Sequence, residues 1–140
     1  MKEIIFVCTG NTCRSPLAES YANTHVDGHV FNSRGLSVTS GSTNIKSLQI
    51  IERESLKMPH LPRQLTDEDT ENAVLITMTA GHKNQILMNY PNAIVYTLGE
   101  LSGEHTDISD PYGGTEEDYE YTYQELRRFI DKVDFKSDIF

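Results

Sequence analysis

Apolar and polar residues alternate along the chain in blocks that predict strands and helices in turn. Short apolar runs rich in β-branched residues indicate strands buried on both faces of a sheet. The predicted strands are residues 4–7, 30–33, 74–78 and 93–98. The stretches between them carry apolar residues three or four positions apart, a spacing typical of helices that pack on one side. The pattern therefore alternates strand and helix.

The first two predicted helices have recognisable ends. Ser15 and Pro16 form a helix start, with serine as the N-cap and proline in the first position. This helix is expected to end before the polar turn at 24–29. The second is expected over residues 45–57 and to be stopped by Pro59. Its inward positions are Leu48, Ile51 and Leu56.

The remaining helices are marked by caps and breakers. Thr66 is the N-cap of a short acidic helix, and residues 81–89 form a further helix ended by Pro91. Thr115 caps the last helix, which carries an apolar seam expected to pack into the core. The seam consists of Tyr119, Tyr123, Leu126, Ile130 and Val133.

Alternation of this kind predicts the α/β class, with a parallel sheet covered by helices on both faces. At 140 residues the chain is expected to be one domain, residues 1–140. In such sheets ligands bind beyond the carboxyl ends of the strands. The chemistry is therefore sought in the loops at that edge.

Composition limits the function classes. A net charge of −9 without a basic stripe argues against nucleic-acid binding. No apolar run approaches membrane-span length, and the chain enters its first strand without a signal-peptide pattern, so a cytoplasmic location with no membrane partner is expected. The five histidines lack metal-ligand spacing, so no metal is expected and most of them should lie at the surface. They are His25, His29, His60, His82 and His105.

The strongest chemical signal is the segment from Cys8 to Arg14, between the first strand and the first helix. Gly10 and Asn11 can take the left-handed conformations that a tight loop needs. Such a loop points successive backbone N–H groups into one concavity at a helix N-terminus, which suits a phosphate-sized dianion. Arg14 adds a planar fork for two phosphate oxygens. A Cys8 thiolate on the floor of that site would be a nucleophile aimed at phosphorus.

A phosphoryl transfer to Cys8 also needs a proton for the leaving group. Asp110 lies on a loop that follows the fourth strand and therefore belongs to the same edge of the sheet. Pro111 stiffens its backbone, and Tyr112 can form an aromatic wall. From the residues alone, a plain Asp-Pro turn with an exposed tyrosine explains this segment equally well.

Two segments together resemble the low-molecular-weight protein-tyrosine-phosphatase family, most closely its bacterial branch that includes protein arginine phosphatases. They are Val7-Cys8-Thr9-Gly10-Asn11-Thr12-Cys13-Arg14-Ser15-Pro16 and Asp110-Pro111-Tyr112-Gly113-Gly114. The resemblance implies a three-layer domain with a four-stranded parallel sheet. It further implies phosphorylated protein substrates, no cofactor, and a phosphocysteine mechanism with Cys8, Arg14 and Asp110 as catalytic residues.

The resemblance also assigns supporting roles. The phosphate-binding loop would comprise Thr9, Gly10, Asn11, Thr12, Cys13 and Ser15, with Tyr112 as the substrate wall. Asn11 and Ser15 would hold the loop in shape, and the Ser15 hydroxyl would stabilise the thiolate. His60, in His60-Leu61-Pro62-Arg63-Gln64, and Ser33 would brace the loop through hydrogen bonds.

Substrate preference and regulation are left open by the motifs. At the position of Thr12, tyrosine-directed members of the family usually have a branched aliphatic residue, whereas the arginine phosphatases have a residue that resembles the threonine found here. The resemblance therefore slightly favours phosphoarginine over phosphotyrosine as the substrate. A near-isosteric threonine without effect on selectivity is the alternative. Cys13 could form a disulfide with Cys8 on oxidation, or simply pack behind the loop. An arsenate reductase of the same fold is less favoured, because no relay cysteine follows Cys13.

Overall fold

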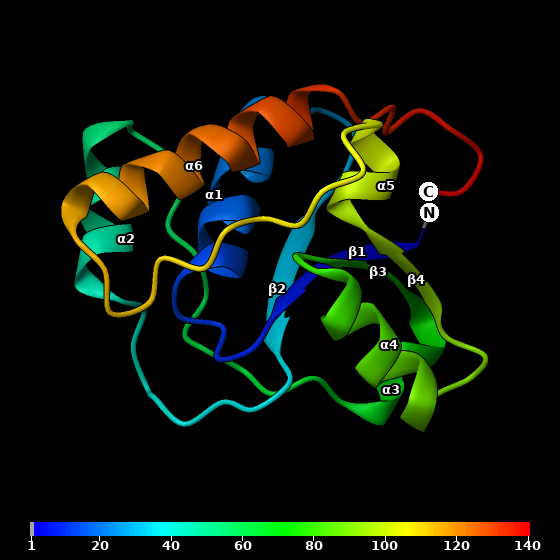
Figure 1. The fold of residues 1–140 in the computed structure, drawn as a ribbon. Coiled ribbons are helices and arrows are strands. Elements are labelled where there is room, and N and C mark those ends of the chain that lie inside the picture. The colour runs from blue at the N-terminus through cyan, green and yellow to red at the C-terminus, as the bar shows by residue number, and fades with distance from the viewer. Residues whose placement is uncertain (1) are drawn as a thin grey trace.

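The computed structural model of the protein describes residues 2–140 and contains one parallel sheet of four strands in the order β2-β1-β3-β4. The strands are β1 (Glu3–Cys8), β2 (Phe31–Gly35), β3 (Ala73–Thr77) and β4 (Ile94–Thr97). All three neighbouring pairs run parallel, as the alternating pattern predicts. Figure 1 shows the strands crossing the molecule between two groups of helices.

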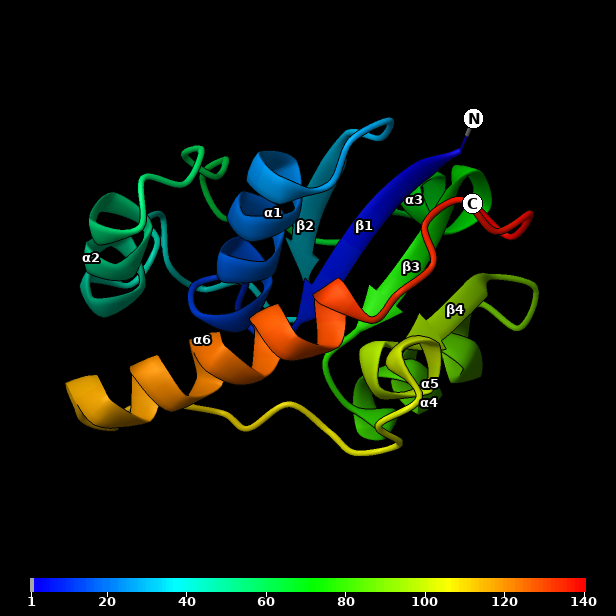
Figure 2. The ribbon, with the colours of Figure 1, turned by 90° about the horizontal axis from the view of Figure 1, so that it is seen from above.

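Helices cover both faces of the sheet (Figures 1 and 2). They are α1 (Arg14–His25), α2 (Ile45–Arg53), α3 (Asp67–Asn72), α4 (Ala80–Asn89), α5 (Leu98–Ser102) and α6 (Glu116–Asp131). On one face α1 and α6 pack against the sheet, with α2 against both of these helices; α3 and α4 cover the other face. The three-layer α/β architecture is thereby confirmed.

The central strand β1 places side chains in both hydrophobic cores. Ile4 and Phe6 belong to the larger core under α1 and α6, whereas Ile5 and Val7 belong to the smaller core under α4. All four are fully buried. Each such side chain contributes about 1.5–3 kcal/mol to stability relative to an exposed one. The strand that ends in Cys8 is thus held from both faces.

Cys8 is the last residue of β1. The chain leaves β1 for β2 on one side and returns past it to β3 on the other, so the strand order reverses between β1 and β3. Ligands of open parallel sheets bind at such a reversal, beyond the carboxyl ends of the strands. The topology therefore positions the Cys8 loop where a binding site is expected.

The predicted end of the second helix is wrong. Helix α2 stops at Arg53, before Pro59, because Ser55 takes a left-handed conformation with φ of 54°. The Leu56 N–H then donates to the Ile51 carbonyl and closes the helix end, while the Leu56 side chain is still buried. The helix stops through backbone geometry rather than through proline.

Helix α5 was not predicted, and the fourth strand is shorter than expected. Leu98 begins this short helix instead of ending the strand. Thr97 caps it by accepting from the Glu100 N–H, and the Glu100 carboxylate accepts from the Thr97 N–H. Gly103, with φ of 79°, ends it. The Thr-x-x-Glu capping box was the available sequence signal.

Two features are absent from residues 2–140. In this range no helix is long and apolar enough to cross a membrane. The same range holds no group of three or more His, Cys, Asp or Glu side chains arranged to bind a metal ion.

Candidate active site

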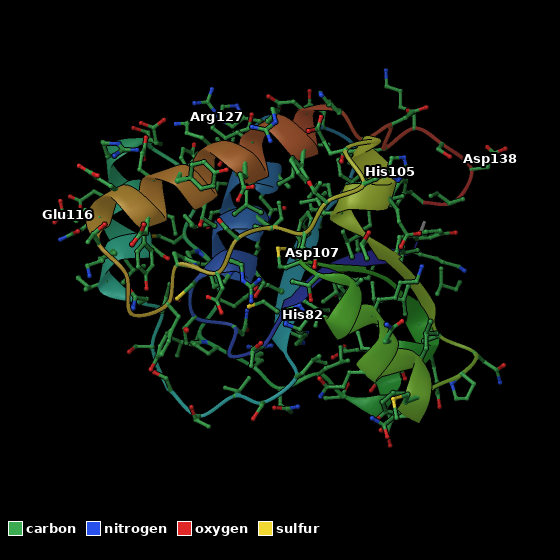
Figure 3. All side chains as sticks on the ribbon, in the orientation of Figure 1. His82, His105, Asp107, Glu116, Arg127 and Asp138 are labelled. Atoms are coloured by element: carbon green, nitrogen blue, oxygen red, sulfur yellow. The ribbon has the colours of Figure 1, made fainter. Side chains whose placement is uncertain are left out.

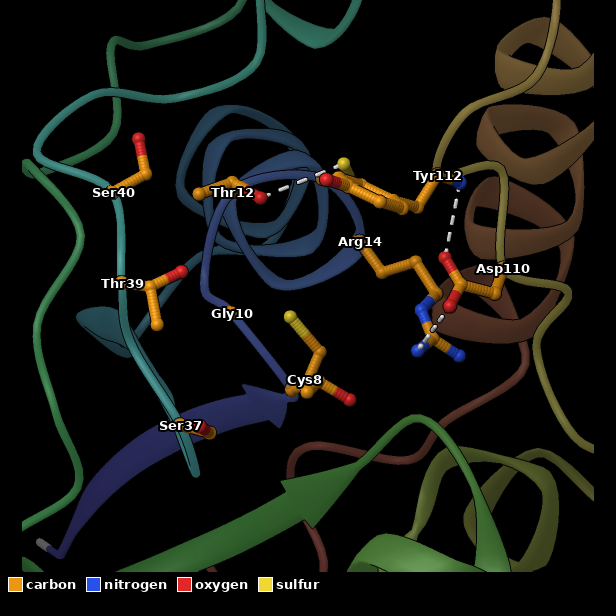
Figure 4. Close-up of a pocket in the computed structure, with 11 residues that line it drawn as sticks. Cys8, Gly10, Thr12, Arg14, Ser37, Thr39, Ser40, Asp110 and Tyr112 are labelled. Atoms are coloured by element: carbon orange, nitrogen blue, oxygen red, sulfur yellow. Dashed lines mark hydrogen bonds and ion pairs between the residues drawn. The ribbon is translucent and has the colours of Figure 1, made fainter.

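A cavity of about 260 Å³ lies over the Cys8 loop at the carboxyl edge of the sheet (Figure 4). Its lining residues come from the Cys8 loop, from the segment after β2 and from the Asp110 loop. They are Cys8, Thr9, Gly10, Thr12, Cys13, Arg14, Ser37, Thr39, Ser40, Asp110 and Tyr112. The two segments singled out in the sequence, about a hundred residues apart, therefore share one cavity.

The start of α1 differs from the prediction. Cys13, not Ser15, is the N-cap, and no side chain accepts the N–H groups of the first turn. Ser15 lies inside the helix, where its hydroxyl contacts the Cys8 sulfur at 2.9 Å. The first-turn N–H groups of α1 are thus not consumed by a capping side chain, which is the arrangement that anion sites at helix N-termini require.

Asn11 holds the loop from within. It has φ of 56°, whereas Gly10 does not take a left-handed conformation, so only half of that prediction is right. The Asn11 amide donates to Ser15 Oγ at 2.8 Å and to Ser33 Oγ at 2.9 Å. Its oxygen accepts from the Arg63 N–H at 2.9 Å. All three bonds are made by a side chain that is 2% exposed.

These bonds give the Ser15 hydroxyl a direction. Its oxygen already accepts from Asn11, so its own proton is available for the Cys8 sulfur 2.9 Å away. A hydrogen bond to the charged form of a thiol favours the thiolate. Ser15 is therefore placed to donate a hydrogen bond to the Cys8 sulfur.

A buried carboxylate that the sequence analysis did not identify completes the bracing. Ser33 Oγ donates to Glu19 Oε1 at 2.5 Å. The other oxygen, Oε2, accepts from the His60 N–H at 3.1 Å and lies 3.3 Å from His60 Nδ1. His60 and Ser33 thus reach the loop in series, through Glu19 and Asn11, and neither lines the cavity. Glu19 lies in a helix whose residues Arg14 to Ala22 are all buried, and this burial depends on the fold rather than on a local sequence motif.

Gly35 lies directly under the loop. A Cβ atom there would come within 2.7 Å of Val38 Cγ2, 2.8 Å of the Thr9 carbonyl oxygen and 3.0 Å of the Asn11 nitrogen. The next residues donate to the loop from the same strand end: Leu36 N–H to the Cys8 carbonyl and Ser37 N–H to that of Thr9. The end of β2 is thus fitted closely to the loop.

Arg14 joins the loop to the Asp110 segment. The guanidinium is 5% exposed; it donates from Nη1 to the Ile108 carbonyl at 3.1 Å, and Nη2 lies 3.5 Å from Asp110 Oδ2. Asp110 itself is 56% exposed, and its other oxygen accepts from the Tyr112 N–H at 3.1 Å. In Figure 4 its carboxylate faces Arg14 across the side of the cavity. The candidate acid is therefore adjacent to the anion site and open to solvent.

Opposite walls of the cavity differ in character. Tyr112 is exposed and extends from the Asp110 loop, whereas Ser37, Thr39 and Ser40 supply hydroxyl groups from the other side (Figure 4). These three hydroxyl residues are not among the site residues predicted from the sequence. Thr12 lies between the walls, with its hydroxyl 3.6 Å from Cys13 Sγ.

Cys13 and Cys8 are both free and buried. Cys13 Sγ lies 3.4 Å from the Tyr119 hydroxyl of α6. Burial is the largest cause of a raised pKa at Tyr119, and the contact with Cys13 adds to it, so this tyrosine is a neutral partner for the sulfur. Of the five histidines, His82 departs most from the expected surface location, because it is 8% exposed and contacts Thr9.

Comparison with known proteins identifies the class to which this fold and cavity belong. Residues 3–134 match the family model for low molecular weight phosphotyrosine protein phosphatases. The chain belongs to this family and is a hydrolase of that class.

Individual relatives carry both tyrosine and arginine phosphatase names. A PtpB low molecular weight protein-tyrosine-phosphatase of Staphylococcus haemolyticus is 41% identical over 132 residues, which cover 93% of this chain and 96% of the relative. The YwlE arginine phosphatase of Geobacillus stearothermophilus superimposes with a TM-score of 0.87 at 35% identity, covering 94% of this chain and 90% of that one. A YwlE cysteine-to-serine mutant, described as carrying a phosphorylated active-site serine, matches at 31% identity with a TM-score of 0.85, covering 93% and 91%.

Proposed function

We propose that the chain is a protein phosphatase that hydrolyses phosphorylated residues through a phosphocysteine on Cys8 and that it prefers phosphoarginine to phosphotyrosine. The observation that carries this proposal is the position of the Cys8 sulfur. It lies on the floor of the cavity, 2.9 Å from a serine hydroxyl that is held to donate to it. Arg14 and Asp110 flank the same cavity.

The first half of the reaction breaks the bond between phosphorus and the substrate's oxygen or nitrogen. The Cys8 thiolate attacks phosphorus in line, while Arg14 and the loop N–H groups hold the equatorial oxygens. Asp110 gives its proton to the departing atom as the sulfur–phosphorus bond forms. In the second half, the Asp110 carboxylate takes a proton from water, which attacks phosphorus and releases inorganic phosphate and the thiolate.

Preference for phosphoarginine is supported by the hydroxyl and carboxylate groups that line the cavity. A guanidinium group carries several N–H donors and no acceptor, so it needs oxygen atoms around it. Thr12, Ser37, Thr39 and Ser40 provide hydroxyl oxygens, and Asp110 provides a carboxylate. A tyrosine ring, which buries apolar surface, meets one aromatic wall in Tyr112 and hydroxyl groups opposite. The structural similarity to YwlE arginine phosphatases agrees with this assignment, whereas the PtpB names favour phosphotyrosine.

The direct test is side-by-side turnover of two peptides that differ only in carrying phosphoarginine or phosphotyrosine, with 4-nitrophenyl phosphate as a third substrate. We expect a higher kcat/KM for the phosphoarginine peptide. The Cys8→Ser protein should turn over none of the three; turnover by this variant would overturn the nucleophile assignment.

Thr12 is the proposed specificity residue, and three variants separate its features. Thr12→Ile should suppress phosphoarginine hydrolysis while sparing 4-nitrophenyl phosphate. Thr12→Val removes the hydroxyl at nearly constant volume, and Thr12→Ser keeps the hydroxyl without the methyl group. Equal losses on both substrates in Thr12→Ile would contradict the proposed role.

Redox control of the same site is part of the proposal. Peroxide would convert the Cys8 and Cys13 thiols to a disulfide with release of water, which shields the nucleophile from irreversible oxidation. Activity lost to peroxide should then return with a thiol reductant in the wild type. In Cys13→Ser the loss should become irreversible; full recovery in this variant would rule out a protective disulfide.

A further inference from the structure

His82 is a buried imidazole beside the Cys8 loop that the proposed reaction does not use. It is the third residue of α4, and its Nε2 lies 2.9 Å from Thr9 Oγ1. The beginning of α4 is fixed by two contacts: Thr79 Oγ1 accepts from the His82 N–H, and Asp107 Oδ1 accepts from the Ala80 N–H. Figure 3 labels His82 and Asp107 in the middle of the molecule, near the ends of the strands.

The imidazole is neutral at neutral pH. Burial, together with the nearby charge of Arg14, lowers the pKa of His82 to about 4, although the carboxylates of Asp110 and Asp107 oppose the shift. A neutral imidazole has one N–H donor and one lone-pair acceptor on its two nitrogens. The two nitrogens of His82 therefore have different roles.

The hydrogen bonds decide which nitrogen carries the proton. Within residues 2–140, Nδ1 is buried and has no hydrogen-bond partner, and Nε2 contacts only the Thr9 hydroxyl. A proton on Nδ1 would leave a buried N–H without an acceptor, an arrangement that is rare in proteins and costly. A proton on Nε2 leaves only a lone pair unpaired and gives Thr9 Oγ1 a donor.

We propose that His82 is a positioning residue that donates from Nε2 to Thr9 Oγ1 and thereby presents the Thr9 hydroxyl proton to a phosphoryl oxygen in the cavity. Thr9 lines the cavity next to Cys8, and its hydroxyl lies 2.9 Å from His82 Nε2. Because its oxygen accepts from His82, the hydroxyl keeps its own proton for donation. This inference rests on the proposed function of the Cys8 loop and adds one side-chain donor to its backbone N–H groups.

The first test reads the tautomer directly and does not depend on turnover. Long-range ¹H–¹⁵N NMR spectra of the wild-type protein at pH 7 distinguish a protonated Nε2 from a protonated Nδ1. We expect the proton on Nε2 in the protein bound to inorganic phosphate and in the protein without it. A proton on Nδ1 would overturn the inference even if the protein is an active phosphatase.

The second test is a double-mutant cycle measured on 4-nitrophenyl phosphate. Thr9→Val should lower kcat/KM roughly tenfold, the effect of losing one hydrogen bond to a charged group. His82→Leu should lower it by somewhat less, and the double variant should be no worse than Thr9→Val alone. His82→Gln, which keeps a donor near the position of Nε2, should restore most of the loss.

A matched control separates positioning from mere stabilisation of α4. Ile86 is a buried residue of the same helix that packs in the core away from the cavity, so Ile86→Val should lower stability without lowering kcat/KM. Additive losses in the cycle, or a loss in Ile86→Val equal to that in His82→Leu, would show that His82 acts through stability and would overturn the inference. If the wild type hydrolyses no phosphorylated substrate, the proposed function fails, while the tautomer still decides the role of His82.

Discussion

The two loops that form the cavity are held in opposite ways. Beneath the Cys8 loop, the side chains of Asn11, Ser15, Glu19 and Ser33 are all buried and hydrogen-bonded to one another or to the backbone. The Asp110 loop lies at the surface, and Asp110 is 56% exposed. The proposed nucleophile and anion site are thus built rigidly, whereas the proposed acid is left accessible to water and to a leaving group. Preorganised donors need such rigidity, and an acid that must exchange protons needs access.

The largest expected effect on activity concerns Asp110, in the exposed loop. Asp110→Asn should lower kcat on the phosphoarginine peptide by roughly 10²–10⁴-fold, the usual range for loss of a general acid. The loss should be smaller on phosphotyrosine and smallest on 4-nitrophenyl phosphate, because the guanidine is the most basic leaving group of the three. The free energy of unfolding should change by less than about 1 kcal/mol, since the carboxylate is exposed. Equal losses on all three substrates would exclude Asp110 as the proton donor.

The buried imidazole of His82, beside the Cys8 loop, should make the stability of the protein depend on pH. Its pKa is about 4 in the folded protein against 6.5 when unfolded. The unfolded chain therefore binds the proton first as pH falls, and stability drops between about pH 6.5 and pH 4. The full shift is equivalent to about 3 kcal/mol. Urea unfolding of wild type and His82→Gln across this window should show a steeper loss for the wild type, and parallel curves would contradict the assignment.

Glu19→Gln tests the bracing network at nearly constant volume. The substitution replaces one carboxylate oxygen by a donor that must face the donors of His60 or Ser33. We expect a loss of about 2 kcal/mol in the free energy of unfolding, together with lower kcat through movement of Asn11. His60→Ala should cost less, because its backbone N–H still donates to Glu19. A fully active Glu19→Gln protein would mean that the loop holds its shape without the Glu19 carboxyl group.

The smallest effect is expected at Lys46, which links α2 to the exposed loop. Its Nζ donates to the Gly114 carbonyl at 2.8 Å and lies 5.6 Å from the centre of the Tyr119 ring. Lys46→Met should lower kcat by a few-fold and the free energy of unfolding by about 1 kcal/mol. The loss should be greater on phosphoarginine than on 4-nitrophenyl phosphate if Lys46 acts by positioning Asp110. An equal loss would indicate a purely structural contact.

The sequence predicted the fold and the parts of the site that lie close together in the chain. Apolar runs located all four strands, and the segment Cys8–Arg14, predicted to bind an anion, lines the cavity at the edge of the sheet. Asp110 needed the resemblance, because an Asp-Pro turn alone is ambiguous. Glu19 and His82 escaped prediction because their roles depend on contacts with Ser33 and Thr9, 14 and 73 residues away in the chain. No local pattern shows that a polar side chain will be buried against a distant loop.

The close fit of Gly35 under the Cys8 loop has a consequence for how this enzyme can change. Any side chain at this position would displace the backbone of Thr9 and Asn11, so the geometry of the Cys8 loop requires glycine there. Only a few residues further along the same segment, Ser37, Thr39 and Ser40 are exposed and line the cavity. Random substitution of residues 35–40 should therefore give two different outcomes. No replacement of Gly35 should be active, whereas replacements of Ser37, Thr39 and Ser40 should alter substrate selectivity. Attempts to change the substrate selectivity of this phosphatase should therefore begin at Ser37, Thr39 and Ser40.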